Sequence, residues 1–310
     1  MSNLARRGAL LALLTALVSG VSVYVNGFGV RQVADPFVYT TAKNLLVGLA
    51  LAALVVVPLV WRELKGLTLR QWGALLILGL IGGSLPFLLF FQGLREATAP
   101  SAAFIHKTLF IWVALLAVPL LKERLGLSQL LALAVLVLGN LVLLGRPTAW
   151  ALGQAELLVL SATLLWAVEA VLARRLMRDI SAPVAALGRM GFGALALLGF
   201  LVVSGRAGTL VSLEAAQWGW VLLTAVFLLA YVGCYYSALK RAPATLVASV
   251  LVLGSVITSL LHALFSAQTY SPEQVGGLVC IVASAALWLY VVRNRPVVET
   301  AGAEVARATR

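Results

Sequence analysis

The chain has 310 residues, of which 62% are hydrophobic and only 11% are charged. This composition excludes an ordinary soluble domain, because too few polar residues remain to cover a water-exposed surface. The net charge of +12 would suit a nucleic-acid-binding protein, but the chain lacks the polar residues to build a solvated basic face. Its two cysteines lie inside apolar runs and provide neither a disulfide framework nor a zinc motif.

Ten apolar runs long enough to cross a bilayer follow one another along the chain. The first run follows Arg6 and Arg7 and lacks a signal-peptide cleavage site, so we expect it to be retained as a helix. Because backbone groups in lipid must be satisfied within each segment, we predict an all-α integral membrane protein with ten transmembrane helices. Their approximate limits are 8–30, 36–60, 70–93, 98–120, 128–145, 153–176, 182–204, 217–239, 244–267 and 272–292.

The basic residues predict the orientation of these spans. When the loops are assigned to alternate sides, sixteen Lys and Arg residues fall on the side of the N-terminus, four fall on the other side, and three lie within spans. Cytoplasmic loops carry such an excess of positive charge, so both termini are predicted to be cytoplasmic. This pattern explains the basic charge without a nucleic-acid partner. Residues 293–310 are expected to form a cytoplasmic polar tail.

An internal repeat divides the chain into two halves of five spans each. A shift of 146 residues aligns Gln71-Trp72-Gly73 with Gln217-Trp218-Gly219, and Lys43 with Arg189. Because five is an odd number, the second half must cross the membrane in the opposite sense, as in the inverted 5+5 repeats of secondary transporters. Such repeats place a substrate site near the midplane and exchange conformations in alternating access. The predicted repeats cover residues 1–147 and 148–292.

Short motifs recur next to the spans of both halves. The sixth span contains Leu164-Leu165-Trp166-Ala167 and Ala173-Arg174-Arg175-Leu176, Leu121-Lys122-Glu123-Arg124-Leu125 precedes the fifth span, and Ser271-Pro272-Glu273-Gln274 opens the tenth. In these motifs the chain resembles the EamA-type, ten-helix members of the drug/metabolite transporter superfamily over nearly its whole length. The resemblance implies a solute carrier whose cavity is lined mainly by spans one to four and six to nine. Spans five and ten would be peripheral, at a contact between two copies.

Lys107 in the fourth span is the most deeply placed cation. It lies nine residues, or about 13 Å, from the start of its span and therefore near the bilayer midplane. A cation there costs about 2.5–3.5 kcal/mol, so it should face a polar cavity or a partner. We expect it to bind a substrate carboxylate or phosphate or to carry a proton, with pairing to Glu169 or to helix carbonyls as the structural alternative. The neighbouring His106 is turned about 100° around the helix and is expected to contact another part of the substrate.

Lys43 and Arg189 occupy equivalent positions of the two halves, each about 10 Å from the start of its span. In an inverted repeat they lie toward opposite sides of the membrane, which suits gate residues that attract an anionic group from either side. The alternative is that both long side chains reach the nearest lipid headgroups. Tyr39 accompanies Lys43 at helical spacing and favours a polar face there.

Glu169 is the only acid in the interior of a predicted span, away from the first and last turns, and it follows Trp166 by one helical turn. A single buried carboxylate in a carrier is a candidate for proton coupling, whereas an ion pair with Arg189 is the structural alternative. Trp166 is expected either to stack on the substrate or to pack against other helices. In the first span, a polar stripe lines either the cavity or a helix contact stabilised by hydrogen bonds, each worth less than about 2 kcal/mol. This stripe consists of Thr15, Ser19, Ser22 and Asn26.

These features predict a secondary active transporter that works as an exporter by alternating access, with proton coupling as an extension. Three intramembrane cations against one acid favour a small polar metabolite with a carboxylate, such as an amino acid or an organic acid. The alternatives are a membrane-embedded enzyme or a structural subunit that transports nothing. An enzyme is disfavoured because the sequence lacks clustered intramembrane acids, an HExxH motif and a paired-Asp motif. The lack of a GxxxxGK[ST] ATP-binding loop disfavours ATP-driven pumping by this chain alone.

We therefore expect no catalytic residue, no metal and no cofactor. The expected partners are the small-molecule substrate, membrane lipid and a second copy of the chain. The short loops are typical of a protein of the prokaryotic inner (plasma) membrane.

Overall fold

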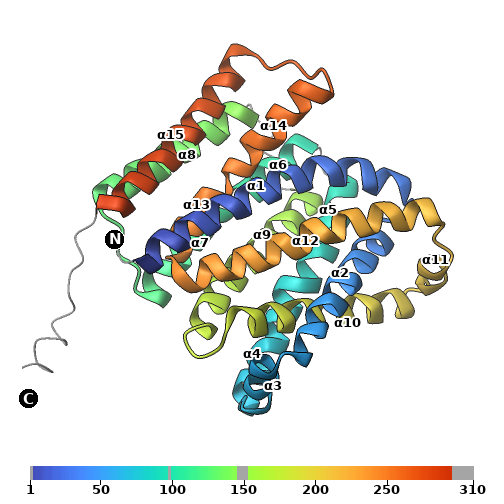
Figure 1. The fold of residues 1–310 in the computed structure, drawn as a ribbon. Coiled ribbons are helices and arrows are strands. Elements are labelled where there is room, and N and C mark those ends of the chain that lie inside the picture. Colours follow the sequence, from blue (N-terminus) through green and yellow to red (C-terminus); the bar gives the residue numbers. More distant parts are fainter. Residues whose placement is uncertain (1–2, 97–98, 145–152, 295–310) are drawn as a thin grey trace, which may run out of the picture.

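A computed structural model describes residues 3–96, 99–144 and 153–294. Within these ranges the chain folds into helices and contains no strand (Figure 1). Nine helical segments of the described chain are long and apolar enough to cross a membrane, and the remaining predicted span is a shorter apolar helix, Leu127–Leu143. The prediction of an all-helical integral membrane protein is thus confirmed. The predicted repeat boundary at 147 and 148 and nearly all of the predicted tail lie outside the described residues.

The ten predicted spans correspond to the following helices of Figure 1. Some spans are formed by two or three consecutive elements, because the helix is interrupted within the span. The bounds are α1 Asn3–Gln32, α2 Pro36–Ala52 with η1 Ala53–Val56, α4 Leu69–Leu78 with η2 Gly79–Ser84 and α5 Leu85–Glu96, α6 Ala99–Lys107 with α7 Leu109–Leu121, α8 Leu127–Leu144, α9 Gln154–Leu176, α10 Ala182–Val203, α12 Ala215–Arg241, α13 Ala244–Leu251 with α14 Leu253–Phe265, and α15 Pro272–Asn294. Two short helices, α3 Pro58–Lys65 and α11 Ala207–Val211, connect spans.

Four spans differ from the continuous helices that the sequence predicts. The second ends at Val56 and not at residue 60, because Pro58 has no backbone N–H to continue the helix and instead begins α3. The fourth breaks at Thr108 and the ninth at Val252, where the N–H donates to the third preceding carbonyl, over 3.0 Å and 3.3 Å. The third contains the π-helical segment η2, Gly79–Ser84.

Helix contacts are repeated between the two halves of the chain. α1 packs against α12 and α14, and in the same way α9 packs against α5 and α7, while α2 and α10 contact each other. Local structure is repeated as well. The N–H groups of Thr68 and Glu214, 146 residues apart, each donate to the glutamine three residues later over 2.9 Å. Lys122 and Ala267, 145 residues apart, both adopt a left-handed backbone, with φ of 57° and 51°.

α8 and α15 lie side by side at the edge of the bundle, apart from the central spans (Figure 1). Glycine allows this pair to approach closely: a Cβ on Gly277 would lie 2.6 Å from the Leu143 nitrogen and 2.7 Å from the Gly139 carbonyl oxygen. Ser284 adds a hydrogen bond of 2.6 Å to the Ala132 carbonyl. The peripheral position agrees with what the family resemblance implies for spans five and ten.

Two motif residues cap helices at one end of the bundle. Glu123 follows α7 and accepts hydrogen bonds from the N–H of Ala244 (2.6 Å), the N–H of Thr245 (3.1 Å) and the Thr245 hydroxyl (2.7 Å), at the start of α13. Arg174 donates to two carbonyls at the end of α12, each over 2.6 Å. A carboxylate at a helix N-terminus and a guanidinium at a C-terminus both satisfy backbone groups that the helix leaves unpaired. These motif residues therefore join spans four, six, eight and nine.

Candidate functional site

A charge centre forms where α9, α10 and α12 meet. It consists of Glu169, Arg189 and Tyr236, which are 2%, 5% and 0% exposed. The Arg189 Nε lies 3.6 Å from Glu169 Oε1, and the Tyr236 hydroxyl donates a hydrogen bond to the same oxygen. The ion pair proposed as the structural alternative for Glu169 is therefore present. Tyr236, which lies 67 residues from Glu169, was not among the predicted site residues.

The carbonyl of Gly82 in η2 completes this centre. It accepts one hydrogen bond from Arg189 Nη2, over 2.9 Å, and another from Trp166 Nε1, over 3.2 Å. A Cβ on residue 82 would collide with the Glu169 Cγ and lie 3.1 Å from Arg189 Nε, so only glycine leaves room for the pair. Close contact between Gly83 and Gly193 brings α10 against the third span at this level.

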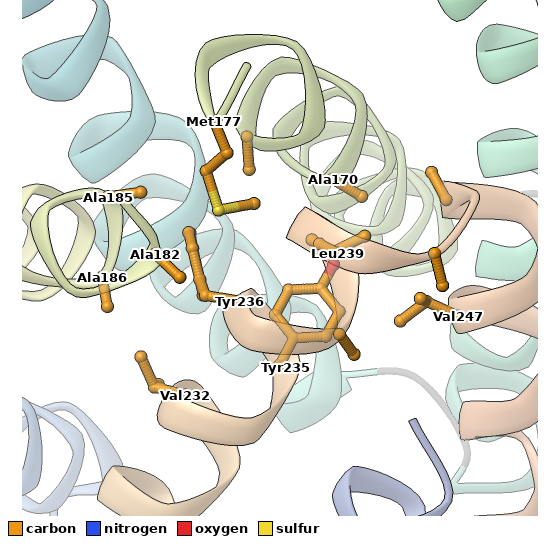
Figure 2. Packing of buried hydrophobic residues seen from close by; sticks show 14 of the residues in the cluster. Ala170, Met177, Ala182, Ala185, Ala186, Val232, Tyr235, Tyr236, Leu239 and Val247 are labelled. Atoms are coloured by element: carbon orange, nitrogen blue, oxygen red, sulfur yellow. The ribbon is translucent and has the colours of Figure 1, made fainter. Parts of the chain in front are cut away.

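The buried side of the charge centre is apolar. Figure 2 shows Tyr235 and Tyr236 of α12 among small side chains that include Ala170 of α9 and Ala182 and Ala185 of α10. Protein interiors of this kind are packed as tightly as organic crystals, so the cluster leaves little space for solvent. The charge centre is consequently held within a rigid apolar surrounding on this side.

Three aromatic side chains lie around the ring of Trp166. Its ring centroid lies 5.1 Å from that of His106, 5.3 Å from that of Phe87 and 5.7 Å from that of Phe90. All four side chains are half-buried. The Nδ1 of His106 is buried and has no hydrogen-bonding partner among the described residues. The structure thus brings His106 and Trp166 together. Because Trp166 donates a hydrogen bond to the Gly82 carbonyl of η2, both residues lie next to the charge centre.

Lys107 is the last residue of α6, at the break of the fourth span. It is half-buried and forms no hydrogen bond or ion pair with any residue that the structure describes. Glu169, which the sequence analysis considered as its partner, pairs with Arg189 and Tyr236 instead. A cation in the last turn of a helix interacts favourably with the helix dipole, and this interaction compensates part of the cost of burial.

Lys43 belongs to a second polar cluster, formed by α1, α2 and α12. Its Nζ donates to Asn26 Oδ1 over 3.0 Å and lies 5.2 Å from the Tyr39 ring centroid. The Tyr39 hydroxyl bonds to the same Asn26 oxygen (3.1 Å) and to Thr224 Oγ1 (2.8 Å). Asn26 in turn donates to the backbone and hydroxyl oxygens of Ser22. Lys43 and Arg189, although equivalent in sequence, therefore bind different partners.

The polar stripe of α1 does not act as one unit. Ser22 and Asn26 belong to the Lys43 cluster, whereas Thr15 is fully buried and donates to the Leu11 carbonyl of its own helix over 2.6 Å. Ser19 lies where α1 packs against α14, with its Cβ 3.6 Å from the place of a Cβ on Gly254. Thr15 and Ser19 thus belong to α1 itself and to its contact with α14.

Comparisons with known proteins agree with this architecture. The sequence model of the EamA-like transporter family matches residues 6–145 and again residues 153–290. A solved structure titled "Crystal structure of protein" shares the fold with a TM-score of 0.73 and 19% sequence identity, over 93% of this chain and 98% of that chain. No curated protein matches the chain at the threshold that we applied.

The two family matches together cover nearly the whole described chain, one in each half. They account for the repeated helix contacts and for the motifs around Glu123 and Arg174. The family consists of membrane transporters and not of enzymes. The chain therefore belongs to the EamA-like transporter family.

Proposed function

We propose that this transporter is a secondary active exporter of a small polar metabolite with a carboxylate, such as an amino acid or an organic acid. The observation that carries the proposal is Lys107, a cation in the middle of a span that has no ion-pairing partner among the described residues. Unpaired charge at membrane depth is costly, and an anionic ligand would offset this cost. Lys107 is the proposed anchor of the substrate carboxylate.

The other polar side chains support an anionic substrate. Lys43 forms no ion pair within the described chain, and of the three cations in the span interiors, Lys43, Lys107 and Arg189, Arg189 alone pairs with a described acid. The spans therefore contain more positive than negative charge. We assign the surface around Lys107 and Lys43 to substrate binding, with His106, Trp166, Tyr39, Ser22 and Asn26 as its polar and aromatic contacts.

The test is a thermal-shift screen of the detergent-purified protein against amino acids, organic acids, sugar phosphates and organic cations. A ligand that binds only the folded state raises the unfolding temperature by mass action. We expect carboxylates to stabilise the wild type and not Lys107→Ala, while Lys65→Ala, outside the spans, responds like the wild type. Stabilisation by cations alone, equal in all three proteins, would refute the carboxylate assignment. Saturable counterflow in proteoliposomes then distinguishes a carrier from a structural subunit.

We further propose that Glu169 couples transport to protons. Its carboxylate is the only acid in the interior of the predicted spans, and its partners Arg189 and Tyr236 come from two other helices. A proton on this carboxylate would weaken both contacts, and it would thereby link protonation to the separation of α9 from α10 and α12. Glu169→Gln, which mimics the protonated acid, is expected to abolish the response of transport to a pH gradient. An unchanged response would exclude Glu169 as the coupling site.

We also propose that the two halves form an inverted repeat with limits 1–147 and 148–292 and that the protein resides in a prokaryotic inner membrane. Both termini are proposed to be cytoplasmic. The distribution of Lys and Arg supports this orientation. Reporter fusions at the C-terminus that are active only in the cytoplasm test it. A second copy is proposed to contact the peripheral α8–α15 pair, which cross-linking in membranes would detect.

A further inference from the structure

The third span changes its helix type where it meets the charge centre. α4 and α5 are α-helical, but η2 between them, Gly79–Ser84, is π-helical. Segments of this type leave backbone groups without regular partners and are frequent at functional sites. Two residues after η2 lies Pro86, which is buried.

Pro86 explains why the Gly82 carbonyl is available to side chains. In an uninterrupted α-helix the carbonyl of residue 82 accepts a hydrogen bond from the N–H of residue 86. Proline has no N–H, and its ring clashes with the carbonyl four residues earlier. The Gly82 carbonyl accepts instead from Arg189 (2.9 Å) and Trp166 (3.2 Å), which lie 107 and 84 residues away.

The equivalent helix of the second half contains no such device. α12, the equivalent of the third span, is one continuous helix from Ala215 to Arg241, and the positions that correspond to Pro86 are Tyr231 and Val232. A further proline within a helix, Pro119 of α7, is exposed, and its fourth preceding carbonyl, that of Leu115, receives no side-chain hydrogen bond from the described residues. Among the residues that the structure describes, the combination of a proline, a π-helical segment and side chains that donate to the freed carbonyl therefore occurs at the charge centre alone.

We propose that Pro86 is a positioning residue of the charge centre. Because Pro86 provides no N–H, the Gly82 carbonyl is left to accept the hydrogen bonds that hold the Arg189 guanidinium and the Trp166 indole. The carbonyl thereby sets where Arg189 meets Glu169 and where Trp166 meets His106. This role deepens the proposed function, because it concerns the same side chains, but its test needs no substrate and can fail independently of transport.

The first test is spectroscopic. The protein, which has eight tryptophans, is labelled with 5-fluorotryptophan, and Trp166→Phe identifies the fluorine resonance of Trp166. In Pro86→Ala the new N–H at residue 86 competes for the Gly82 carbonyl, so the Trp166 resonance is expected to shift by more than its line width. Pro119→Ala is the matched control and should leave that resonance in place. An unshifted resonance in Pro86→Ala would overturn the proposal.

The second test is a double-mutant cycle of Pro86→Ala and Arg189→Gln, measured as shifts in unfolding temperature in micelles. If Pro86 acts through Arg189, the effect of Pro86→Ala is reduced when Arg189 is already replaced, because residues that act on one shared hydrogen-bond acceptor, here the Gly82 carbonyl, are not additive. Additive shifts would overturn the proposal. Pro86→Val provides the same N–H on a different side chain and repeats both tests. Failure of both Pro86 variants to fold, while Pro119→Ala folds, would show that the ring itself packs the span, and would also overturn it.

Discussion

Glu123 offers a direct test of how the two halves are held together. Its carboxylate follows α7 in the first half and accepts three hydrogen bonds from Ala244 and Thr245 at the start of α13 in the second half. Loss of an N-cap costs about 0.5–2 kcal/mol, and each hydrogen bond to a charged group contributes about 1.5–3 kcal/mol. Because the three bonds share one carboxylate, they do not add fully.

We expect Glu123→Ala to lower the free energy of unfolding by about 2–3 kcal/mol, because two backbone N–H groups of α13 lose their acceptor. At about 2–4 °C per kcal/mol for a large domain, the unfolding temperature should fall by about 4–12 °C. The assay is thermal unfolding in detergent micelles, followed by intrinsic fluorescence. Glu123→Gln keeps one acceptor oxygen and should give an intermediate shift.

The chain supplies a matched control for this experiment. Gln268 is the equivalent of Glu123 in the second half, but it is exposed and its side chain makes no hydrogen bond with any described residue. Gln268→Ala is therefore expected to leave the unfolding temperature within about 1 °C of the wild type, as usual for surface substitutions. Equal destabilisation by both alanine variants, or an unchanged temperature in Glu123→Ala, would refute this account of the helix cap.

Three further substitutions follow from the packing and hydrogen bonds. Gly82→Ala should destabilise the protein by about 1–3 kcal/mol, because its Cβ collides with the side chain of Glu169. The control Gly73→Ala, in open space on α4, should not lower the unfolding temperature. Tyr236→Phe should cost about 1.5–3 kcal/mol, because the buried carboxylate loses a donor, and an unaltered unfolding curve would contradict that bond. Gly277→Leu should separate α8 from α15, because its side chain meets the backbone of α8, and should increase proteolysis of α15 in micelles. The control Gly276→Leu has no neighbour within 4 Å and should be cleaved at the wild-type rate.

The spans were predictable because their signal is length and composition, which membrane thickness dictates. The interruptions at Thr108 and Val252 were not predictable, because a helix that is apolar all round has no periodicity to show where its backbone bends. Pro86 was visible in the sequence as a source of a kink, but not the side chains that take over the Gly82 carbonyl. Those donors are brought in by the close packing of α9 and α10 on η2, which depends on tertiary contacts between distant residues.

The candidate site was predicted in part for a similar reason. An isolated acid in a span indicates a buried partner, and Arg189 is indeed next to Glu169. Tyr236 was missed because three tyrosines in one span are also typical of packing at a membrane interface.

The charge centre has no mirror image. The positions that correspond to Glu169 and Arg189 in the first half are Val23 and Lys43. The second half thus carries an ion pair where the first half carries a valine and a lysine that is hydrogen-bonded to Asn26. In a perfectly symmetric carrier the two end states of the transport cycle would have equal energy. In the proposed alternating-access cycle the acid stays in the second half when the halves exchange shape, so we expect the two end states to differ in energy. We therefore expect the empty carrier to rest open to one side, set by the few residues in which the two halves differ.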